Sequence, residues 1–355
     1  MKKFALAAVA AAALTGGVAQ AYTVGTFSNG FVVPNVIHNG PANTTAIGIV
    51  NRSDRTIPVF WTWFDQNSNH GVDGCFPMTV NQYQGINWAA ISGVGMEGKR
   101  GYMVFSVGTV PAGTPAAAVC TLAGASVLAG TAAAAPWVAT PTPAAQISAN
   151  AFYVDVAGKS VAFTPVVDGP LYLNAALAAP VNLTTMGPTS LQRVAGAASV
   201  AGTAPVLAEP AAVPAAAGSN SSPVWGRANT TSMSLRYFID GTVNSGNDTR
   251  IAVWSTGDQR GTHTVNIYDN AQNRQSVNFI LNESELSWFD PETISGRPAA
   301  YLDGFIDWNP SAVPAGFPAG AAEPALNVGG GDVYAYSVVI APAFGAVQSL
   351  LGAHR

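Results

Sequence analysis

Oxygen-bearing side chains recur at alternate positions in one polar stretch of the sequence. Asp65, Asn67, Asn69 and Asp73 lie within the run DQNSNHGVDG. Alternate oxygen ligands in a tight turn can converge on a hard cation such as calcium. However, Phe76 stands at the twelfth position from Asp65, where a calcium loop of this kind has a glutamate. Two interpretations remain open, namely a calcium site and a polar β-hairpin whose Asn, Asp and Gly residues supply turn conformations.

A second arrangement that could do chemistry is the pair Asp303 and Asp307. On a strand these carboxylates share a face, with Phe305 between them, and paired carboxylates can hydrolyse a glycosidic bond. Acidic pairs on strands are, however, usually solvated surface groups. The four histidines are scattered, and the sequence contains no HExxH pair, GxSxG elbow, P-loop or dinucleotide fingerprint. We therefore expect no enzyme, and a hydrolase is the third of three functional hypotheses.

Aromatic side chains form the third set of candidates. A binding module, for carbohydrate above all, would use outward-facing rings with nearby Asn and Asp side chains. The rings that could serve as ligand contacts are Phe64, Tyr268, Trp137 and Trp225. This is the alternative functional hypothesis, and two or three exposed coplanar rings would favour it.

The elements that must position these residues occur twice. Residues 43–65 and 247–269 align without a gap at a constant offset of about 204 residues. Such internal similarity indicates two copies of one unit. The identical pairs are Asn43 with Asn247, Thr45 with Thr249, Ile47 with Ile251, Asp54 with Asp258, and Asp65 with Asp269.

The alignment also predicts which face of the strand at residues 57–64 is buried. Trp61 and Trp63 stand opposite Val265 and Ile267, so both positions are apolar in both copies. Because successive side chains of a strand alternate between faces, we expect the two tryptophans in the core. The outward aromatic pair is then Phe60 and Phe64, which could mark a contact surface.

The fold class that follows is all-β. Short runs rich in β-branched and aromatic residues, separated by turn clusters, predict two tandem antiparallel β-sandwiches, immunoglobulin-like in the loose architectural sense. Ala/Pro-rich loop insertions at residues 111–146 and 309–331 occupy the same connection in both copies. We predict a signal peptide at residues 1–21, domain 1 at 22–170, an Ala/Pro-rich linker or insertion at 171–223, and domain 2 at 224–355.

The first 21 residues and the two cysteines bear on the cellular compartment. A short basic start, an Ala-rich apolar run and the Ala-Gln-Ala pattern at residues 19–21 are typical of a cleaved secretory signal. In an exported protein, Cys75 and Cys120 predict one disulfide. No later apolar run is long enough to span a bilayer. We therefore expect an exported bacterial protein without a transmembrane segment, located at the cell surface, outside the cell or in the periplasm.

Composition narrows the function classes. Charged residues make up only 10% of the chain, the formal net charge is −4, and there is no basic cluster, so a nucleic acid is not an expected partner. Few lysines with abundant Ala, Thr, Asn and Gly resemble the composition of secreted bacterial surface-layer and adhesin-type proteins. The leading hypothesis is a non-enzymatic structural protein of a surface layer, filament or matrix. Its partners would be itself, other cell-envelope proteins or a glycan. We expect no cofactor, with calcium as the one alternative.

Overall fold

The structure is a computed structural model that describes part of the chain. The predicted signal peptide, the linker at 171–223 and most of both predicted insertions lie outside the described residues. None of the described helices is long and apolar enough to cross a membrane. The described residues are 27, 30–54, 56–107, 120, 147–156, 159–168, 226–227, 233–240, 248–255, 259–309, 332–341, 346–351 and 353–354.

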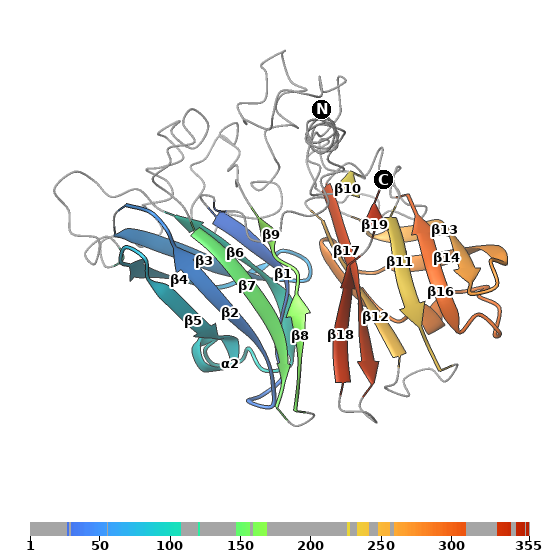
Figure 1. Ribbon diagram of the computed structural model, residues 1–355, viewed down its shortest axis with the longest axis horizontal. Helices are drawn as coiled ribbons and strands as arrows, with labels where there is room; N and C mark the ends of the chain where they lie inside the picture. The colour runs from blue at the N-terminus through green and yellow to red at the C-terminus, as the bar shows by residue number, and fades with distance from the viewer. Residues whose placement is uncertain are drawn as a thin grey trace, which may run out of the picture.

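The N-terminal half, residues 30–168, is an antiparallel sheet of nine strands that folds over into two layers (Figure 1). One layer has the order β4-β3-β6-β1-β9 and is called the β3 layer; the other, β5-β2-β7-β8, is called the β2 layer. They join where β1 pairs with β2 through His38 and Thr44. The strands are β1 Gly30–His38, β2 Asn43–Asn51, β3 Ile57–Asp65, β4 His70–Met78, β5 Tyr83–Asn87, β6 Lys99–Val107, β7 Ile147–Asp155, β8 Ser160–Thr164 and β9 Val167–Asp168.

The C-terminal half, residues 226–354, contains two antiparallel sheets of five strands each. The β13 sheet has the order β14-β13-β16-β11-β19, and the β12 sheet has the order β10-β17-β12-β15, with β18 paired to β17. The strands are β10 Gly226–Arg227, β11 Met233–Phe238, β12 Asp248–Ser255, β13 Gly261–Asp269, β14 Arg274–Leu281, β15 Leu286–Phe289, β16 Asp303–Trp308, β17 Asp332–Ala341, β18 Ala346–Leu351 and β19 Ala353–His354.

The two halves pair their strands in the same order. The order β4-β3-β6-β1-β9 corresponds to β14-β13-β16-β11-β19, and the order β5-β2-β7-β8 corresponds to β15-β12-β17-β18. Thr45 and Thr249, which align in the sequence, have the same structural role in the two halves. The hydroxyl oxygen of Thr45 accepts a hydrogen bond from the amide of Ile37, and that of Thr249 accepts one from the amide of Phe238, both at 2.9 Å. Antiparallel all-β architecture is thus confirmed, whereas the immunoglobulin-like assignment and the domain boundaries stay predictions. Asn247 and Asp258 lie outside the described residues.

Alternation along β3 separates two apolar clusters. Trp61 and Trp63 point between the two layers of the N-terminal half and are buried there with Trp88, as the sequence predicts. Phe60 and Phe64 point the other way, and both are buried against the C-terminal half. The outward aromatic pair is therefore a contact surface, and its partner is the same chain.

The surface between the two halves is a continuous apolar cluster, called here the interhalf interface. It joins the outer face of the β3 layer to the outer face of the β12 sheet, while β8 lies beside β18 (Figure 1). The ring of Tyr102 meets the edge of Trp254 at a centroid distance of 5.7 Å. Its buried members are Val32, Phe60, Phe64, Tyr102, Val104, Val167, Ala252, Trp254, Leu286, Tyr334, Tyr336 and Val338.

The predicted disulfide between Cys75 and Cys120 is present. It closes a loop of 45 residues and ties β4 to a described residue within the predicted insertion. Cross-links of this kind persist in oxidising compartments, which agrees with an exported protein. Strand β5 ends at Asn87 and is followed by a helical turn, Trp88–Ile91, in which the Trp88 side chain turns into the core.

Candidate functional site

The polar turn after β3 is organised by the Asp65 carboxylate. One carboxylate oxygen accepts hydrogen bonds from the amides of Asn67 and Asn69, at 2.8 and 2.9 Å, and the other accepts one from the Asn69 side chain. Ser68 adopts a left-handed conformation with φ of 60°. These bonds fix a tight hairpin turn of the kind that Asp and Asn favour.

The C-terminal half builds the same turn around Asp269. Its carboxylate accepts hydrogen bonds from the amides of Ala271 and Asn273 and from the Asn273 side chain. The Asn273 side-chain bond holds the pKa of Asp269 below its ordinary value. Gln272 has a φ of 68° at the position equivalent to Ser68. Asp65 and Asp269 therefore stabilise the same kind of turn in the two halves.

In the N-terminal half, this turn also fastens the two halves together. The Asn67 side-chain oxygen accepts hydrogen bonds from the amide and the hydroxyl of Ser284, at 3.0 and 3.2 Å. The Asn67 amide nitrogen donates to the Glu283 carboxylate. The carbonyl oxygen of Gln66 accepts from the amides of Glu285 and Leu286. Because Ala271 stands where Asn67 does, the equivalent turn lacks this connecting side chain.

The four residues predicted as calcium ligands have different partners in the structure. Asp65 and Asn69 bond to each other, Asn67 reaches the other half, and Asp73 bonds to His70 at 2.9 Å. The amide nitrogen of Asn69, not its oxygen, faces the Asp65 carboxylate. The turn thus has a connecting role within the chain, and calcium binding there stays a prediction.

Arg100, Asn35 and Tyr336 form a chain of polar contacts at the interhalf interface. The Arg100 guanidinium donates to the Asn35 side-chain oxygen at 2.6 Å and lies 4.1 Å from the centre of the Trp288 ring. The Asn35 amide in turn donates to the Tyr336 hydroxyl at 3.1 Å. Burial lowers the pKa of Arg100 to about 10 and raises the pKa of Tyr336 to about 12. The part-buried Arg100 cation over the Trp288 ring adds a cation–π contact between the two halves.

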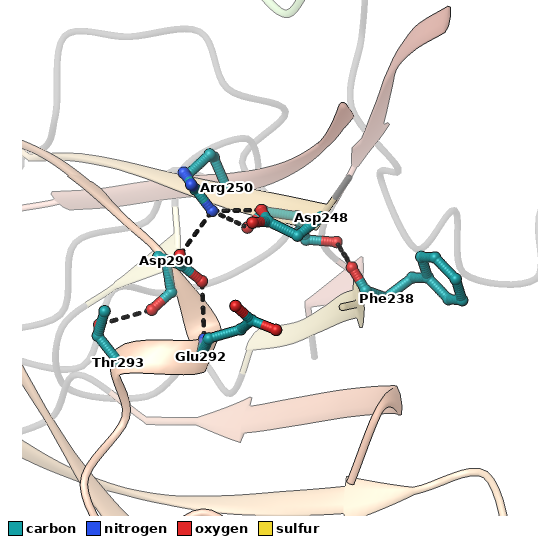
Figure 2. Close-up of polar contacts among 7 residues, drawn as sticks. Phe238, Asp248, Arg250, Asp290, Glu292 and Thr293 are labelled. Atoms are coloured by element: carbon teal, nitrogen blue, oxygen red, sulfur yellow. Dashed lines mark hydrogen bonds and ion pairs between the residues drawn. The ribbon is translucent and has the colours of Figure 1, made fainter. Parts of the chain in front are cut away.

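A cluster of buried carboxylates lies in the C-terminal half (Figure 2). Asp248 at the start of β12 and Asp290 and Glu292 around a short 3-10 helix, Pro291–Thr293, each place one carboxylate oxygen within 4.8 Å of the others. Arg250 bonds to Asp248 and lies 2.8 Å from the Asp290 carboxylate. Burial raises the pKa of Asp248, and the Arg250 hydrogen bond opposes this shift.

The Asp290 side chain also caps the 3-10 helix, because it accepts a hydrogen bond from the Glu292 amide at 2.8 Å. Sequence reasoning missed this cluster. The sequence signal was Asp-Pro-Glu at 290–292, since a capping aspartate before proline is typical of a helix start. Three carboxylate oxygens at this spacing could bind a hard cation. Arg250 already provides a positive charge at this place, so the arrangement is explained by a buried ion pair.

The predicted ligand-contact rings have different positions. Phe64 is 1% exposed in the interhalf interface, where packing against the C-terminal half leaves no ring face for a ligand. Tyr268 is half-buried and stacks on Phe305 with ring centres 4.5 Å apart, so the two rings face each other and do not form a flat platform. Trp137 and Trp225 lie outside the described residues.

The carboxylates of Asp303 and Asp307 also fit hydrolysis poorly. At about 3.3 Å per residue along β16, their Cα atoms are about 13 Å apart, whereas glycosidase carboxyl groups are about 5–9.5 Å apart. Asp303 instead pairs with Arg236 at 3.4 Å, in an exposed ion pair.

The most exposed aromatic ring in the described part of the chain was not among the predicted ligand contacts. Tyr83 is 67% exposed on the outer face of the β2 layer, and its ring lies over Gly48. The side chains of Phe152, Val161 and Phe163 lie on the same face, where Phe152 and Phe163 form an edge-to-face pair. An uncharged aromatic and aliphatic surface of this kind is typical of a contact surface.

Comparisons with known proteins do not narrow the class of the chain beyond an antiparallel all-β protein. No family model matches the sequence, and no curated protein matches it. Among solved structures, a deletion mutant of Bacillus subtilis oxalate decarboxylase is 9% identical, with 91% of this chain and 68% of that chain covered, at a TM-score of 0.17. A point mutant of the same decarboxylase is 10% identical, with 80% and 64% covered, at a TM-score of 0.14. At these scores the likeness supports no conclusion about activity.

Proposed function

We propose that the chain is a non-enzymatic extracellular or cell-surface structural protein, built from two copies of one β-sandwich unit. The observation that carries this proposal is the interhalf interface, in which aromatic faces and the Asn67 contacts join both halves into a single body. A rigid body with few charges suits a subunit of a layer, filament or matrix. The predicted export signal and the disulfide support an extracellular location.

A fractionation experiment tests this role. The full chain, expressed with its first 21 residues in a bacterial host, should be recovered from the envelope or the medium. Its N-terminus should then be Tyr22, and Cys75 and Cys120 should be unreactive to a thiol reagent until reduced. Recovery of a reduced, uncleaved chain from the cytosol would overturn the proposal, as would hydrolysis of a polysaccharide panel by the purified protein.

Carbohydrate binding is the second candidate, and the exposed Tyr83 ring is the observation that favours it. A sugar could stack on this ring beside Asn87, which is exposed on the same strand. A glycan array probed with the wild-type chain and with Tyr83→Ala distinguishes this role. Binding that Tyr83→Ala abolishes, and that the equally outward Phe238→Ala retains, would favour it over a purely structural role.

A further inference from the structure

The outer face of the β2 layer, called here the free face, is an uncharged sheet surface in water. Tyr83, Val161 and Phe152 are 67, 57 and 37% exposed on it. Strand pairing places side chains from four neighbouring strands on this face. Its other residues are Ala46, Gly48, Val50, Gly85, Asn150, Val154 and Phe163, and none of this set is charged.

The same positions in the C-terminal half are already an interface. Val50 pairs with Tyr83 as Trp254 pairs with Leu286, so the two strand registers can be matched residue by residue. The matched residues of the C-terminal half belong to the interhalf interface or pack against it. The matched pairs are Tyr83 with Leu286, Phe152 with Val338, Val154 with Ile340 and Val161 with Val347.

The face that covers these positions within the chain is more polar in the C-terminal half, although Tyr268 and Phe305 stand where Phe64 and Tyr102 do. Strand registers match Asp307 of the β13 sheet to Val104, and Ser234 to Val32. Phe60 corresponds likewise to Thr264. Burying Asp307 against an apolar face would carry a desolvation penalty of several kcal/mol. The outer face of the β13 sheet is therefore an unsuitable partner for the free face.

We propose that the free face binds the free face of a second copy of this chain, in a dimer with two-fold symmetry. Two identical uncharged faces can pack together without burying a charge, and two-fold dimers are the commonest homo-oligomers. The free face ends at β8, which borders β18, so the new contact would be continuous with the interhalf interface. This inference rests on the fold and not on the proposed extracellular role.

The area of the free face limits the expected affinity of the dimer. Two strands of nine residues and two of five cover roughly 450 Å² of flat sheet per partner. A dimer would then bury about 900 Å² in total, below the range of stable interfaces, so we expect a weak, transient dimer with a dissociation constant on the order of micromolar or weaker. Dimers should therefore form at high concentration and dissociate on dilution.

Sedimentation velocity of the full chain over a hundredfold concentration range tests the dimer. Wild-type protein should shift from monomer to dimer, and Val161→Lys and Phe152→Lys should each shift the midpoint at least tenfold toward higher concentration. Ile280→Lys and Phe238→Lys are matched controls, because these side chains are 59 and 51% exposed in the C-terminal half. The controls should dimerise as the wild type does.

Three outcomes would overturn the proposal: a monomer throughout the range, a dimer indifferent to both free-face variants, or a dimer that the controls disrupt equally. A second measurement protects against misfolded variants. Pyrene attached to Val161→Cys should give concentration-dependent excimer fluorescence, whereas pyrene at Ile280→Cys should not. A monomeric wild type would leave the extracellular role standing, because fractionation tests that role separately.

Discussion

The side-chain oxygen of Asn67 accepts two hydrogen bonds from Ser284, a residue 217 positions further along the chain. The bonds connect a turn that both halves possess to the loop between β14 and β15 in the C-terminal half. A turn that resembles a calcium loop in sequence thus acts as a fastening between two β layers.

Replacing Asn67 tests this fastening. Asn67→Ala should lower the free energy of unfolding by about 1–3 kcal/mol, because the part-buried Ser284 amide loses its acceptor. Urea denaturation followed by tryptophan fluorescence measures the change. Asn270→Ala, in the exposed equivalent turn, is the control and should stay within about 0.5 kcal/mol of wild type. Equal losses in both variants would contradict the connecting role.

Two equivalent glycines should resist substitution. A Cβ at Gly101 would collide with the carbonyl oxygen of Phe64, and one at Gly304 would collide with that of Tyr268. Gly101→Ala and Gly304→Ala should each cost about 1–3 kcal/mol, because the backbone of the neighbouring strand must move. At Gly85 the nearest atom would be 3.7 Å away, an ordinary contact, so Gly85→Ala should have a thermal midpoint close to wild type. A larger loss at Gly85 than at Gly101 would refute this.

Removing Arg250 should make stability depend on pH. Arg250→Met leaves the buried Asp248 and Asp290 carboxylates without their cation, at a loss of about 3–5 kcal/mol at neutral pH. Burial already raises the pKa of Asp248. A raised carboxyl pKa favours folding at low pH, and this contribution is lost as pH rises through the folded pKa. The loss should therefore shrink as pH falls from 7 to 4.

Thermal unfolding across this pH range is the measurement, with Arg236→Met as the control. Arg236 pairs with Asp303 on the surface, where such pairs contribute at most about 1 kcal/mol. The control should show a small loss at every pH. A pH-independent loss in Arg250→Met would contradict the ion-pair assignment.

Tyr336 should make the wild type sensitive to alkali. Its folded pKa of about 12 exceeds the unfolded value of about 10, so the folded state keeps the phenol proton in this interval. Stability from this group is complete below pH 10 and is lost as pH rises from 10 to 12. Tyr336→Phe should be about 1 kcal/mol less stable at neutral pH, because Asn35 loses its acceptor.

The difference in stability between wild type and Tyr336→Phe should then narrow above pH 10. Both proteins retain Arg100, so the comparison isolates the phenol. Chemical denaturation at pH 8, 10 and 11 measures the difference, and absorbance at 295 nm should show one fewer late-titrating tyrosine in the variant. A constant difference would contradict the raised pKa.

Sequence periodicity was sufficient to predict the strands and the burial of Trp61 and Trp63, because alternation is a local property of each strand. The sequence also indicated a contact surface at Phe60 and Phe64, but it did not indicate which segment is the occupant of that surface. Identifying the occupant requires knowledge of which sheet packs against which, and this depends on contacts between residues hundreds of positions apart. Tyr83 was missed for the same reason, since its exposure depends on which face remains uncovered.

The register of strand pairing was harder to predict than the presence of the strands. Strand pairing places Trp288 at the position of Gly85 and not at that of Trp88. Trp88 packs in the core of the N-terminal half, whereas Trp288 lies in the interhalf interface beneath Arg100. The connections before β5 and β15 both contain four residues, 79–82 and 282–285, so the two tryptophans lie at different strand positions, and a pattern of apolar residues alone does not reveal this register. The carboxylate cluster around Arg250 has no counterpart in the N-terminal half, where Ala46 stands at that position.

The interhalf interface also determines the order in which the chain can complete its folding. Phe60, Phe64 and Tyr102 are synthesised long before Trp254, Tyr334 and Tyr336, the residues that cover them. During vectorial synthesis or export, the N-terminal half therefore presents an aromatic sheet face to its surroundings until most of the chain has emerged. Exposed apolar surface of this kind is prone to aggregation, and it is covered once β12 and the late strand β17 pack onto the face.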